Sequence, residues 1–377
     1  IFFGDNFSTI QILILIQDIQ LSFKNIAKNL EELDIICKNI LIFIVELRDY
    51  LDSRNNRISY NKIPNKQEFT QKLEEVIDEV VKLNNFIDLH RDQSAEMMKL
   101  SERIKSLVNI TQIWRASDSN DYVYWLDIFA KSIQFNITPI SISSQFKKLQ
   151  DQTKASWIFT SATLAVNDSF EHFQTIMGLE EAKTLQLKSP FNYNENACLY
   201  VPNDMPEPNT EIFNLALIKK VFPLIIAAKG RTFILSTSIK SMNEITSFLK
   251  EEFEKENIIF PILTQGMAPK NMLLDQFKSH GNAVLVGSLS FWEGVDVRGS
   301  ALSLVIIDKL PFQSPGDPVF ESKINMLKTK GGNPFMSLQL PQAIINLKQG
   351  AGRLIRDELD KGVLMICDLR IINKPYG

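Results

Sequence analysis

Close to its carboxyl end the chain carries the stretch Gln349-Gly350-Ala351-Gly352-Arg353-Leu354-Ile355-Arg356. Pro341 precedes it and favours a helix start, because a first-turn N–H would have no partner. On such a helix Arg353 and Arg356 share a face, and their charged forks suit a polyphosphate. Gly352 leaves room for a backbone or a phosphate to approach. For the pair alone, solvated arginines at a helix end explain the pattern better, so the other segments decide.

Composition indicates an ordinary globular protein. The 377 residues suffice for two or three domains, with 45% hydrophobic and 23% charged residues. The net charge is −3, so any contact with nucleic acid must be local. Cys37, Cys198 and Cys367 form no CxxC pair, which predicts reduced thiols and a cytoplasmic location.

The sequence gives no sign of a membrane segment. The apolar run Ile10–Ile16 is too short to span a bilayer, and no signal-peptide pattern precedes it. The chain begins at Ile1 without a methionine and stops abruptly at Gly377. These features predict a fragment of a longer protein.

The first part of the chain is predicted to be helical. Up to Arg115 it has one glycine, Gly4, and one proline, Pro64, and the absence of breakers favours helices. One apolar stripe with helical spacing comprises Phe69, Leu73, Val76, Ile77, Val80 and Leu83. A second comprises Met97, Leu100, Ile104, Leu107 and Val108. Residues 33–51 predict a third, mostly buried helix.

After Arg115 short β-rich runs alternate with helical patterns such as Ser241–Lys255 and Lys270–Ser279. The runs are Trp157–Thr160, Cys198–Val201, Thr232–Leu235, Ile258–Leu263, Ala283–Gly287, Leu302–Ile307 and Val363–Cys367. Such alternation is typical of a parallel α/β sheet, in which ligands bind beyond the carboxyl ends of the strands. The polar clusters of this chain fall at those ends.

Two predicted strands run into small hydroxyl residues. Trp157–Thr160 leads into Ser161-Ala162-Thr163-Leu164, and Thr232–Leu235 leads into Ser236-Thr237-Ser238. Hydroxyl groups at strand ends can relay hydrogen bonds from a nucleotide or contact sugar-phosphate without reading sequence. Taken alone, the first segment is better explained as a turn that caps the next helix. In the second segment, a single hydroxyl can both cap a helix and contact the sugar-phosphate.

Two further segments follow predicted strands. The first is Ser288-Leu289-Ser290-Phe291-Trp292-Glu293-Gly294-Val295-Asp296. Its aromatic rings can stack on a base, and its carboxylates can hold a ribose hydroxyl or a metal-bound water. Packing under a loop is a fair alternative for Trp292 and a weak one for the acidic run. The second, Lys309–Pro318, is fixed by prolines, and no chemical task follows from its residues.

In this order the segments at 161–164, 236–238, 287–296 and 349–356 resemble motifs III to VI of superfamily-two helicases. Lys309–Pro318 and Ile366–Arg370 resemble the DinG/YoaA branch, which is related to XPD. The match is collinear from about Trp125 to the end of the chain. Collinearity makes it far more specific than any single motif.

The resemblance implies an α/β fold with a RecA-like parallel-sheet motor domain and an N-terminal all-helical Arch-like domain. Residues 1–115 would be the Arch-like insertion. Residues 116–190 would be the tail of the first motor domain with motif III, and residues 191–377 the second motor domain with motifs IV to VI. The implied activity is an ATP-dependent DNA helicase, moving 5′ to 3′ as a monomer on single-stranded or forked DNA, with replication or repair proteins as partners.

The resemblance also implies residue roles. Arg353 and Arg356 would be arginine fingers that steady charge on the transferred phosphoryl group of ATP. The other nucleotide-binding residues would be Gln349, Gly352, Glu293, Gly294 and Asp296. Ser161, Ala162 and Thr163 would couple the nucleotide state to domain movement. Single-stranded DNA would contact Ser236, Thr237, Ser238, Ser288 and Trp292.

The sequence departs from that family in three ways. It has no GxxxxGK[ST] phosphate loop and no Asp-Glu-Ala-His box, and it lacks the four cysteines that hold an iron–sulfur cluster in many relatives. The main residues for ATP and Mg²⁺, and any cluster, are expected in a segment upstream of Ile1. This chain alone should therefore not hydrolyse ATP. The alternatives are a truncated, non-catalytic DNA- or protein-binding module and a nucleotide-dependent enzyme unrelated to nucleic acid.

Overall fold

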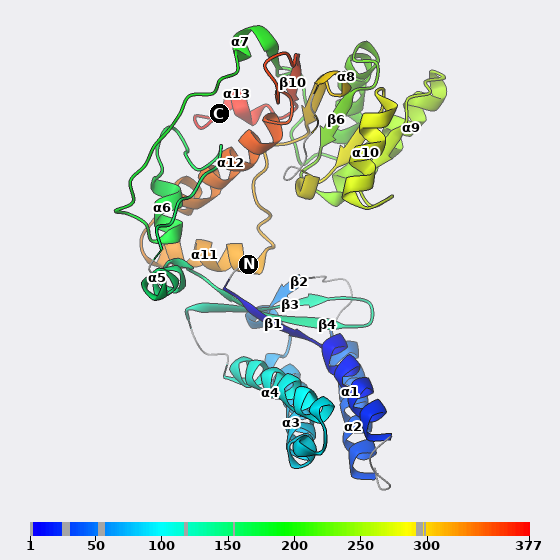
Figure 1. Cartoon of the computed structure of the whole chain (residues 1–377). Coiled ribbons are helices and arrows are strands. Elements are labelled where there is room, and N and C mark those ends of the chain that lie inside the picture. The colour runs from blue at the N-terminus through cyan, green and yellow to red at the C-terminus, as the bar shows by residue number, and fades with distance from the viewer. Residues whose placement is uncertain are drawn as a thin grey trace. The chain divides into compact units, whose positions relative to one another are not determined.

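A computed structural model describes residues 3–24, 31–51, 57–116, 120–153, 155–291, 297 and 299–377. The chain divides into two compact units (Figure 1). The first unit comprises residues 1–155, 176–178 and 314–331, and the second comprises residues 156–175, 179–313 and 332–377. None of the helices in these described ranges is long and apolar enough to cross a membrane.

The first unit combines helices with a small antiparallel sheet. Its helices are α1 (Thr9–Lys24), α2 (Glu31–Tyr50), α3 (Lys66–His90), α4 (Ala95–Arg115), α5 (Ser143–Gln152) and α11 (Pro318–Thr329). Its strands are β1 (Asp5–Ser8), β2 (Arg57–Ser59), β3 (Tyr122–Ile128) and β4 (Ile133–Pro139). They pair in the order β1-β4-β3-β2, and α1 to α4 gather on one side of the sheet in Figure 1.

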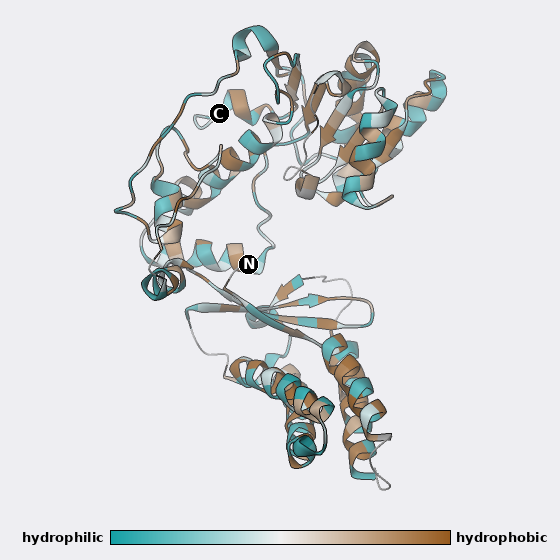
Figure 2. Cartoon of the chain, in the orientation of Figure 1, coloured by the Kyte–Doolittle hydropathy of each residue, from teal (hydrophilic) through white to brown (hydrophobic). Residues whose placement is uncertain are grey.

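The two predicted helical stripes are confirmed as the buried faces of α3 and α4, but the expectation of a mostly buried helix at 33–51 is wrong, because α2 exposes Ile35, Leu41, Ile42 and Val45. All six residues of the α3 stripe are buried, and so are four of the five in the α4 stripe. Figure 2 shows hydrophobic and hydrophilic residues alternating along these helices. The expectation of an all-helical region needs one amendment, because β1 and β2 pair with β4 and β3 to form a sheet. Both strands are at most four residues long, too short to give a periodic signal.

The helix α11 belongs by its contacts to the first unit, although it follows a strand of the second unit in sequence. It packs against β2 and β3. Asp317 caps it by accepting the N–H of Phe320 at 2.9 Å, and Pro318 occupies its first turn. Arg57 binds Asp317 at 3.1 Å, and Lys62 binds Glu321 at 2.6 Å. The proline-rich run therefore carries the chain from one unit into a helix of the other.

The second unit is built on a six-stranded parallel sheet in the order β5-β10-β9-β6-β8-β7. Its strands are β5 (Ala197–Tyr200), β6 (Thr232–Leu235), β7 (Ile262–Thr264), β8 (Val284–Gly287), β9 (Leu304–Ile307) and β10 (Gly362–Ile366). Its helices are α7 (Tyr193–Asn196), α8 (Phe213–Ala227), α9 (Ile239–Lys255), α10 (Lys270–His280), α12 (Leu340–Ala351) and α13 (Arg370–Asn373), while α6 (Glu171–Met177) spans residues of both units. This parallel α/β architecture confirms the predicted fold class.

Alternation along the strands divides the core into two apolar clusters. Phe233 and Leu235 of β6 join residues of α10 in one cluster, while Ile234 joins residues of α8 and α9 in the other. Successive side chains of a strand point to opposite faces, so this sheet is covered by helices on both faces. Its ligand-accessible part is then the edge formed by the strand ends.

One predicted strand does not form. Residues 157–160 have no strand pairing, and Ile158 is 84% exposed. An apolar strand needs a neighbouring strand to satisfy its backbone groups, and no strand in the described part of the chain pairs with it. The predicted run 258–263 is also only partly strand, because β7 begins at Ile262.

We predict that Gly230→Ala destabilises the second unit more than Gly281→Ala. Both glycines have left-handed φ angles, +84° and +66°, which cost other residues about 1–2 kcal/mol. A Cβ on Gly230 would also lie 2.1 Å from the carbonyl oxygen of Asn282, whereas a Cβ on Gly281 meets nothing within 4 Å. Chemical denaturation should show Gly230→Ala losing at least about 2 kcal/mol more. Equal losses would contradict the close packing before β6.

Candidate functional site

The carboxyl ends of four strands lie level with one another in the second unit. Ile307 of β9 pairs with Leu235 of β6 on one side and with Ile366 of β10 on the other, and Leu235 also pairs with Gly287 of β8. The next residue along each strand therefore falls at the same edge. These residues are Ser236, Ser288, Asp308 and Cys367. The edge thus brings together two of the sequence-predicted segments.

The turn Ser236–Ser238 presents its three hydroxyl residues differently. Ser236 is fully buried, Thr237 is half-buried and Ser238 is exposed. The Ser238 hydroxyl accepts the N–H of Ser241 at 3.1 Å and so caps α9. Thr237 and Ser238 are therefore the members of this turn whose side chains reach solvent.

Ser288 is held by a residue that the sequence analysis missed. Its N–H and its hydroxyl both donate to Oε1 of Gln265, at 2.8 Å and 2.9 Å. Ser288 is 7% exposed. Gln265 follows β7, so the signal available in the sequence was another polar residue after a β-rich run. The other predicted site residues of this segment, Trp292, Glu293, Gly294 and Asp296, lie outside the described residues.

Two buried carboxylates follow β9 and β10. Asp368 binds Arg370 through two oxygens, at 2.6 Å and 2.9 Å, and accepts the N–H of Leu310 at 2.8 Å. Asp308 instead accepts the backbone N–H groups of Thr237 at 3.0 Å and Lys309 at 2.6 Å. The two aspartates anchor the start of the proline-rich run and tie it to the Ser236–Ser238 turn.

Cys367 lies between these two carboxylates in the sheet edge and is fully buried. Burial raises the pKa of its thiol well above the ordinary value, and the charges of Asp308 and Asp368 raise it further. The thiol therefore stays protonated at neutral pH, and nucleophilic chemistry at Cys367 is disfavoured.

The arginine segment begins on a helix but does not stay on it. Pro341 lies in the first turn of α12, as predicted, and the helix ends at Ala351. Arg353 and Arg356 therefore lie in the turn after the helix, and the expectation that a helix places them on one face is wrong. Gly352 ends the helix, where an added Cβ would lie 3.1 Å from the carbonyl oxygen of Lys348. The space that glycine leaves there is taken by its own helix.

Buried contacts fix the turn that carries the two arginines. Leu354 and Ile355 are 3% and 4% exposed and belong to the core. Asp360 accepts the N–H groups of Arg356 and Asp357, both at 2.8 Å, through one carboxylate oxygen. Its other oxygen accepts the N–H of Gly299 at 3.0 Å. Asp360 also escaped the sequence analysis, since nothing in its local sequence distinguishes it from a surface aspartate.

The helix α12 also reaches the segment of the predicted motif III. The Lys348 ammonium donates to the carbonyl oxygen of Ala165 at 3.3 Å. In the preceding turn the hydroxyls of Ser161 and Thr163 lie 3.2 Å apart, and the Ser161 hydroxyl accepts the Thr163 N–H. Ser161 and Ala162 are exposed, whereas Gln349 is half-buried. The structure thus brings the 161–165 turn to the helix that precedes the arginines.

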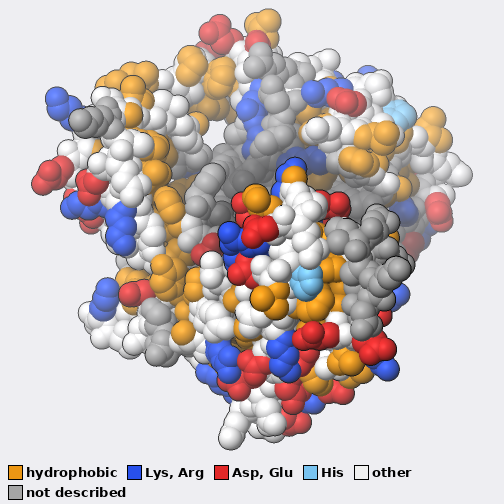
Figure 3. Space-filling view, turned by 60° about the horizontal axis from the view of Figure 1, so that its bottom comes forward, with side chains coloured by type: hydrophobic (Ala, Val, Ile, Leu, Met, Phe, Trp, Pro, Cys, Tyr) orange, Lys and Arg blue, Asp and Glu red, His pale blue; other side chains and the backbone are white. Residues whose placement is uncertain are grey.

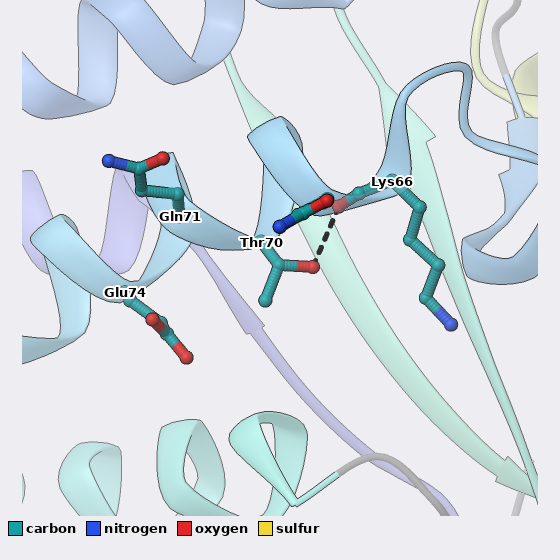
Figure 4. Close-up of a pocket in the computed structure, with 5 residues that line it drawn as sticks. Lys66, Thr70, Gln71 and Glu74 are labelled. Carbon is teal, nitrogen blue, oxygen red and sulfur yellow. Dashed lines mark hydrogen bonds between the residues drawn. The ribbon is translucent and has the colours of Figure 1, made fainter.

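A surface depression of about 570 Å³ lies elsewhere, along the first turns of α3 (Figure 4). It is lined by Lys66, Gln67, Thr70, Gln71 and Glu74. The Thr70 hydroxyl donates back to the Lys66 carbonyl, and the labelled side chains do not converge on a common point in Figure 4. None of these residues was predicted to bind a ligand, so this depression is not the candidate site.

The charge distribution agrees with a local site. On the face drawn in Figure 3, basic and acidic side chains are interspersed, as the net charge of −3 leads one to expect. Among the described residues, no group of three or more His, Cys, Asp or Glu side chains is arranged to hold a metal ion.

Comparison with known families defines the class of the second unit. Residues 221–377 match the family model of the helicase C-terminal domain. This range includes β6, the arginine turn and the three buried aspartates. The resemblance to DinG/YoaA-like superfamily-two helicases that the motifs indicated is confirmed.

Particular relatives cover more of the chain. The whole chain is 39% identical, over 383 aligned residues, to the ATP-dependent DNA helicase YoaA of Escherichia coli (strain K12). It is 34% identical over 245 residues to the ATP-dependent helicase DinG of Mycobacterium tuberculosis (strain ATCC 25177 / H37Ra). That alignment covers 64% of this chain and 36% of the relative. The chain spans 58% of the length of the YoaA relative.

The fold is also that of solved XPD structures. The structure of S. tokodaii Xpd4 aligns with 98% of this chain and 68% of that one, with a TM-score of 0.60 and 12% sequence identity. This similarity supports the predicted fold, a parallel α/β domain together with a helical region.

We predict that Asp360→Ala loosens the arginine turn. Hydrogen bonds to a buried carboxylate contribute about 1.5–3 kcal/mol, and this substitution removes three of them. Native-state hydrogen exchange at the amides of Arg356 and Asp357 should accelerate by about tenfold or more. Asp357→Ala is the matched control, because Asp357 accepts the single N–H of exposed Leu359. Unchanged exchange in Asp360→Ala would contradict the anchoring role.

Proposed function

We propose that this chain is part of an ATP-dependent DNA helicase of the DinG/YoaA type. The complete protein would couple ATP hydrolysis to 5′-to-3′ movement along single-stranded DNA in repair or replication. The observation that carries the proposal is the gathering of motif-like segments within the second unit. The strand ends bring the Ser236–Ser238 turn and Ser288 to one edge, and Lys348 brings the 161–165 turn to α12.

The proposed domains follow the sequence boundaries. Residues 1–115 would be the Arch-like insertion, residues 116–190 the tail of the first motor domain, and residues 191–377 the second motor domain. The parallel sheet from β5 to β10 supports the third of these. The helices α1 to α4 support a mainly helical first one. We infer that the protein acts in the cytoplasm as a monomer, with replication or repair proteins as partners.

The residues of this chain fit a contribution to an ATP site rather than a whole one. Arg353 and Arg356 supply guanidinium donors, which suit the charge of a transferred phosphoryl group. Gln349 and Gly352 precede them, and Glu293, Gly294 and Asp296 would complete the nucleotide-binding set. The sequence has no phosphate loop to cradle a triphosphate with its Mg²⁺. Those groups would come from elsewhere in the complete protein.

Movement on DNA requires that changes at the nucleotide site alter the contacts with DNA. Ser161, Ala162 and Thr163 would pass the nucleotide state to domain movement, since Lys348 contacts Ala165 just beyond them. Thr237 and Ser238 are the accessible hydroxyls for sugar-phosphate contacts, which need not read sequence. Ser236 and Ser288 are buried, so they would support the DNA contacts from below. Trp292 would stack on a base.

We predict that Arg356→Ala in the complete protein abolishes ATP hydrolysis but leaves most DNA binding. Removing an arginine finger lowers turnover by about 10³-fold or more. ATPase rate and affinity for a single-stranded oligonucleotide should be measured side by side. The control is Lys361→Ala, which removes an exposed cation five residues away. Unchanged turnover in Arg356→Ala would exclude the finger role.

We predict that Ser238→Asp weakens binding to single-stranded DNA without destabilising the protein. Aspartate caps a helix as well as serine does, but its charge would repel a phosphate. Ser94→Asp is the matched control, because Ser94 caps α4 of the first unit with the same geometry. Affinity should fall several-fold for Ser238→Asp at low salt, where phosphate contacts are strongest, and stay constant for Ser94→Asp. Equal affinities would argue against DNA at this turn.

A further inference from the structure

Asp308 is a buried carboxyl group whose two oxygens have different partners. It follows β9 and is 0% exposed. Its Oδ1 accepts the backbone N–H groups of Thr237 and Lys309, at 3.0 Å and 2.6 Å. Its Oδ2 lies 2.9 Å from the hydroxyl of Ser241 and 3.5 Å from the hydroxyl of Thr237. One carboxyl group therefore joins the end of β9 to the Ser236–Ser238 turn and to the first turn of α9.

If Asp308 is ionised, two oxygen acceptors compete for the single proton of the Ser241 hydroxyl. The Ser241 hydroxyl is also 3.0 Å from Oδ1 of Asn214, so it faces two acceptors with a single proton. The Asn214 amide cannot be turned to relieve this. Its Nδ2 donates to Glu244 at 2.7 Å, and the turned amide would place oxygen against that carboxylate. A proton on Oδ2 of Asp308, donated to Ser241, completes the chain.

Of the charged groups around Asp308, Lys309 favours the ionised form, but its ammonium makes no ion pair with this carboxyl group. Asp368 and Cys367 are on the adjacent strand end, and Asp368 is already paired with Arg370. The Lys309 ammonium lies over the Phe213 ring, 4.8 Å from its centroid, and Glu244 carries a negative charge beyond Asn214. No ion pair to Asp308 occurs among the described residues.

Burial shifts Asp308 in the same direction as the hydrogen-bond count, towards the protonated form. Desolvation raises the pKa of Asp308 to about 6, against the lowering effect of its hydrogen bonds and of Lys309. An acid whose pKa rises on folding holds a proton that the unfolded chain releases. Stability then falls as pH increases from the ordinary aspartate pKa towards about 6.

We propose that Asp308 is a positioning residue that changes its protonation behind the Ser236–Ser238 turn, and that binding of a DNA phosphate at this turn favours its protonated form. The inference deepens the proposed function and rests on it for the identity of the ligand. A phosphate beside Thr237 and Ser238 repels a carboxylate behind them, so the anion and the Asp308 proton stabilise each other. DNA binding is thereby linked to proton uptake.

The first test measures stability without DNA. An asparagine at 308 can accept the two backbone N–H groups and donate to Ser241, as the protonated acid does. Asp308→Asn should therefore match or exceed the thermal unfolding midpoint of the wild type at about pH 7.5. Asp368→Asn is the matched comparison and should lower the midpoint, because it leaves Arg370 beside a neutral amide. A similar loss in both variants would show that a carboxylate is a better hydrogen-bond partner than an amide at position 308 and would overturn the proposal.

The second test measures affinity for oligo-dT in the complete protein at constant ionic strength. Wild-type affinity should fall several-fold between about pH 5.5 and 7.5, by at most about tenfold per pH unit for one proton. Histidines change charge in the same range, so the informative quantity is the difference between the wild type and Asp308→Asn. The variant should lose this component. A pH dependence equal to that of the wild type would overturn the proposal alone, whereas absence of DNA binding at any pH would overturn the proposed function with it.

Discussion

The backbone ladder of β9 is the constraint on which the candidate site depends. This strand hydrogen-bonds to β6 on one side and to β10 on the other, with Ile307 opposite both Leu235 and Ile366. A parallel ladder in this register fixes the height at which each strand ends. The polar residues that follow are then held together by the sheet, although they come from distant parts of the sequence. A shift of the strand register by one residue would turn every side chain of the strand to the opposite face and separate these polar residues.

Two buried aspartates hold this edge, and a third, Asp360, holds the arginine turn before β10; each of the three has a different kind of partner. Asp368 is paired with the guanidinium of Arg370, Asp360 accepts backbone N–H groups, and Asp308 shares a hydroxyl chain with Ser241. Since burying a polar group without hydrogen bonds is costly, each of these aspartates depends on its partners. The same contacts hold three loops: the proline-rich run and the Ser236–Ser238 turn after the strands, and the arginine turn before β10.

Much of the fold was predictable from the sequence, because it follows from local periodicity. The stripe through Phe69 and Val80 gave α3, and the run Thr232–Leu235 gave β6 at its observed bounds. The failures have physical causes. Residues 157–160 have strand composition but no neighbouring strand in the described chain, and the helix before Arg353 stops because the core takes up Leu354 and Ile355. Asp308 was missed because Thr237 and Ser241 are distant in sequence, and Asp360 because its burial and its contact with Gly299 cannot be read from its neighbours.

The central claim is that Arg353 and Arg356 meet the phosphates of a nucleotide held by another part of the complete protein. The most direct measurement is a high-resolution structure of that protein with single-stranded DNA and a transition-state analogue of ATP. The account predicts guanidinium nitrogens of both arginines within about 3 Å of the phosphate oxygens. Guanidiniums directed away from the analogue, with the nucleotide bound by other cations, would contradict it.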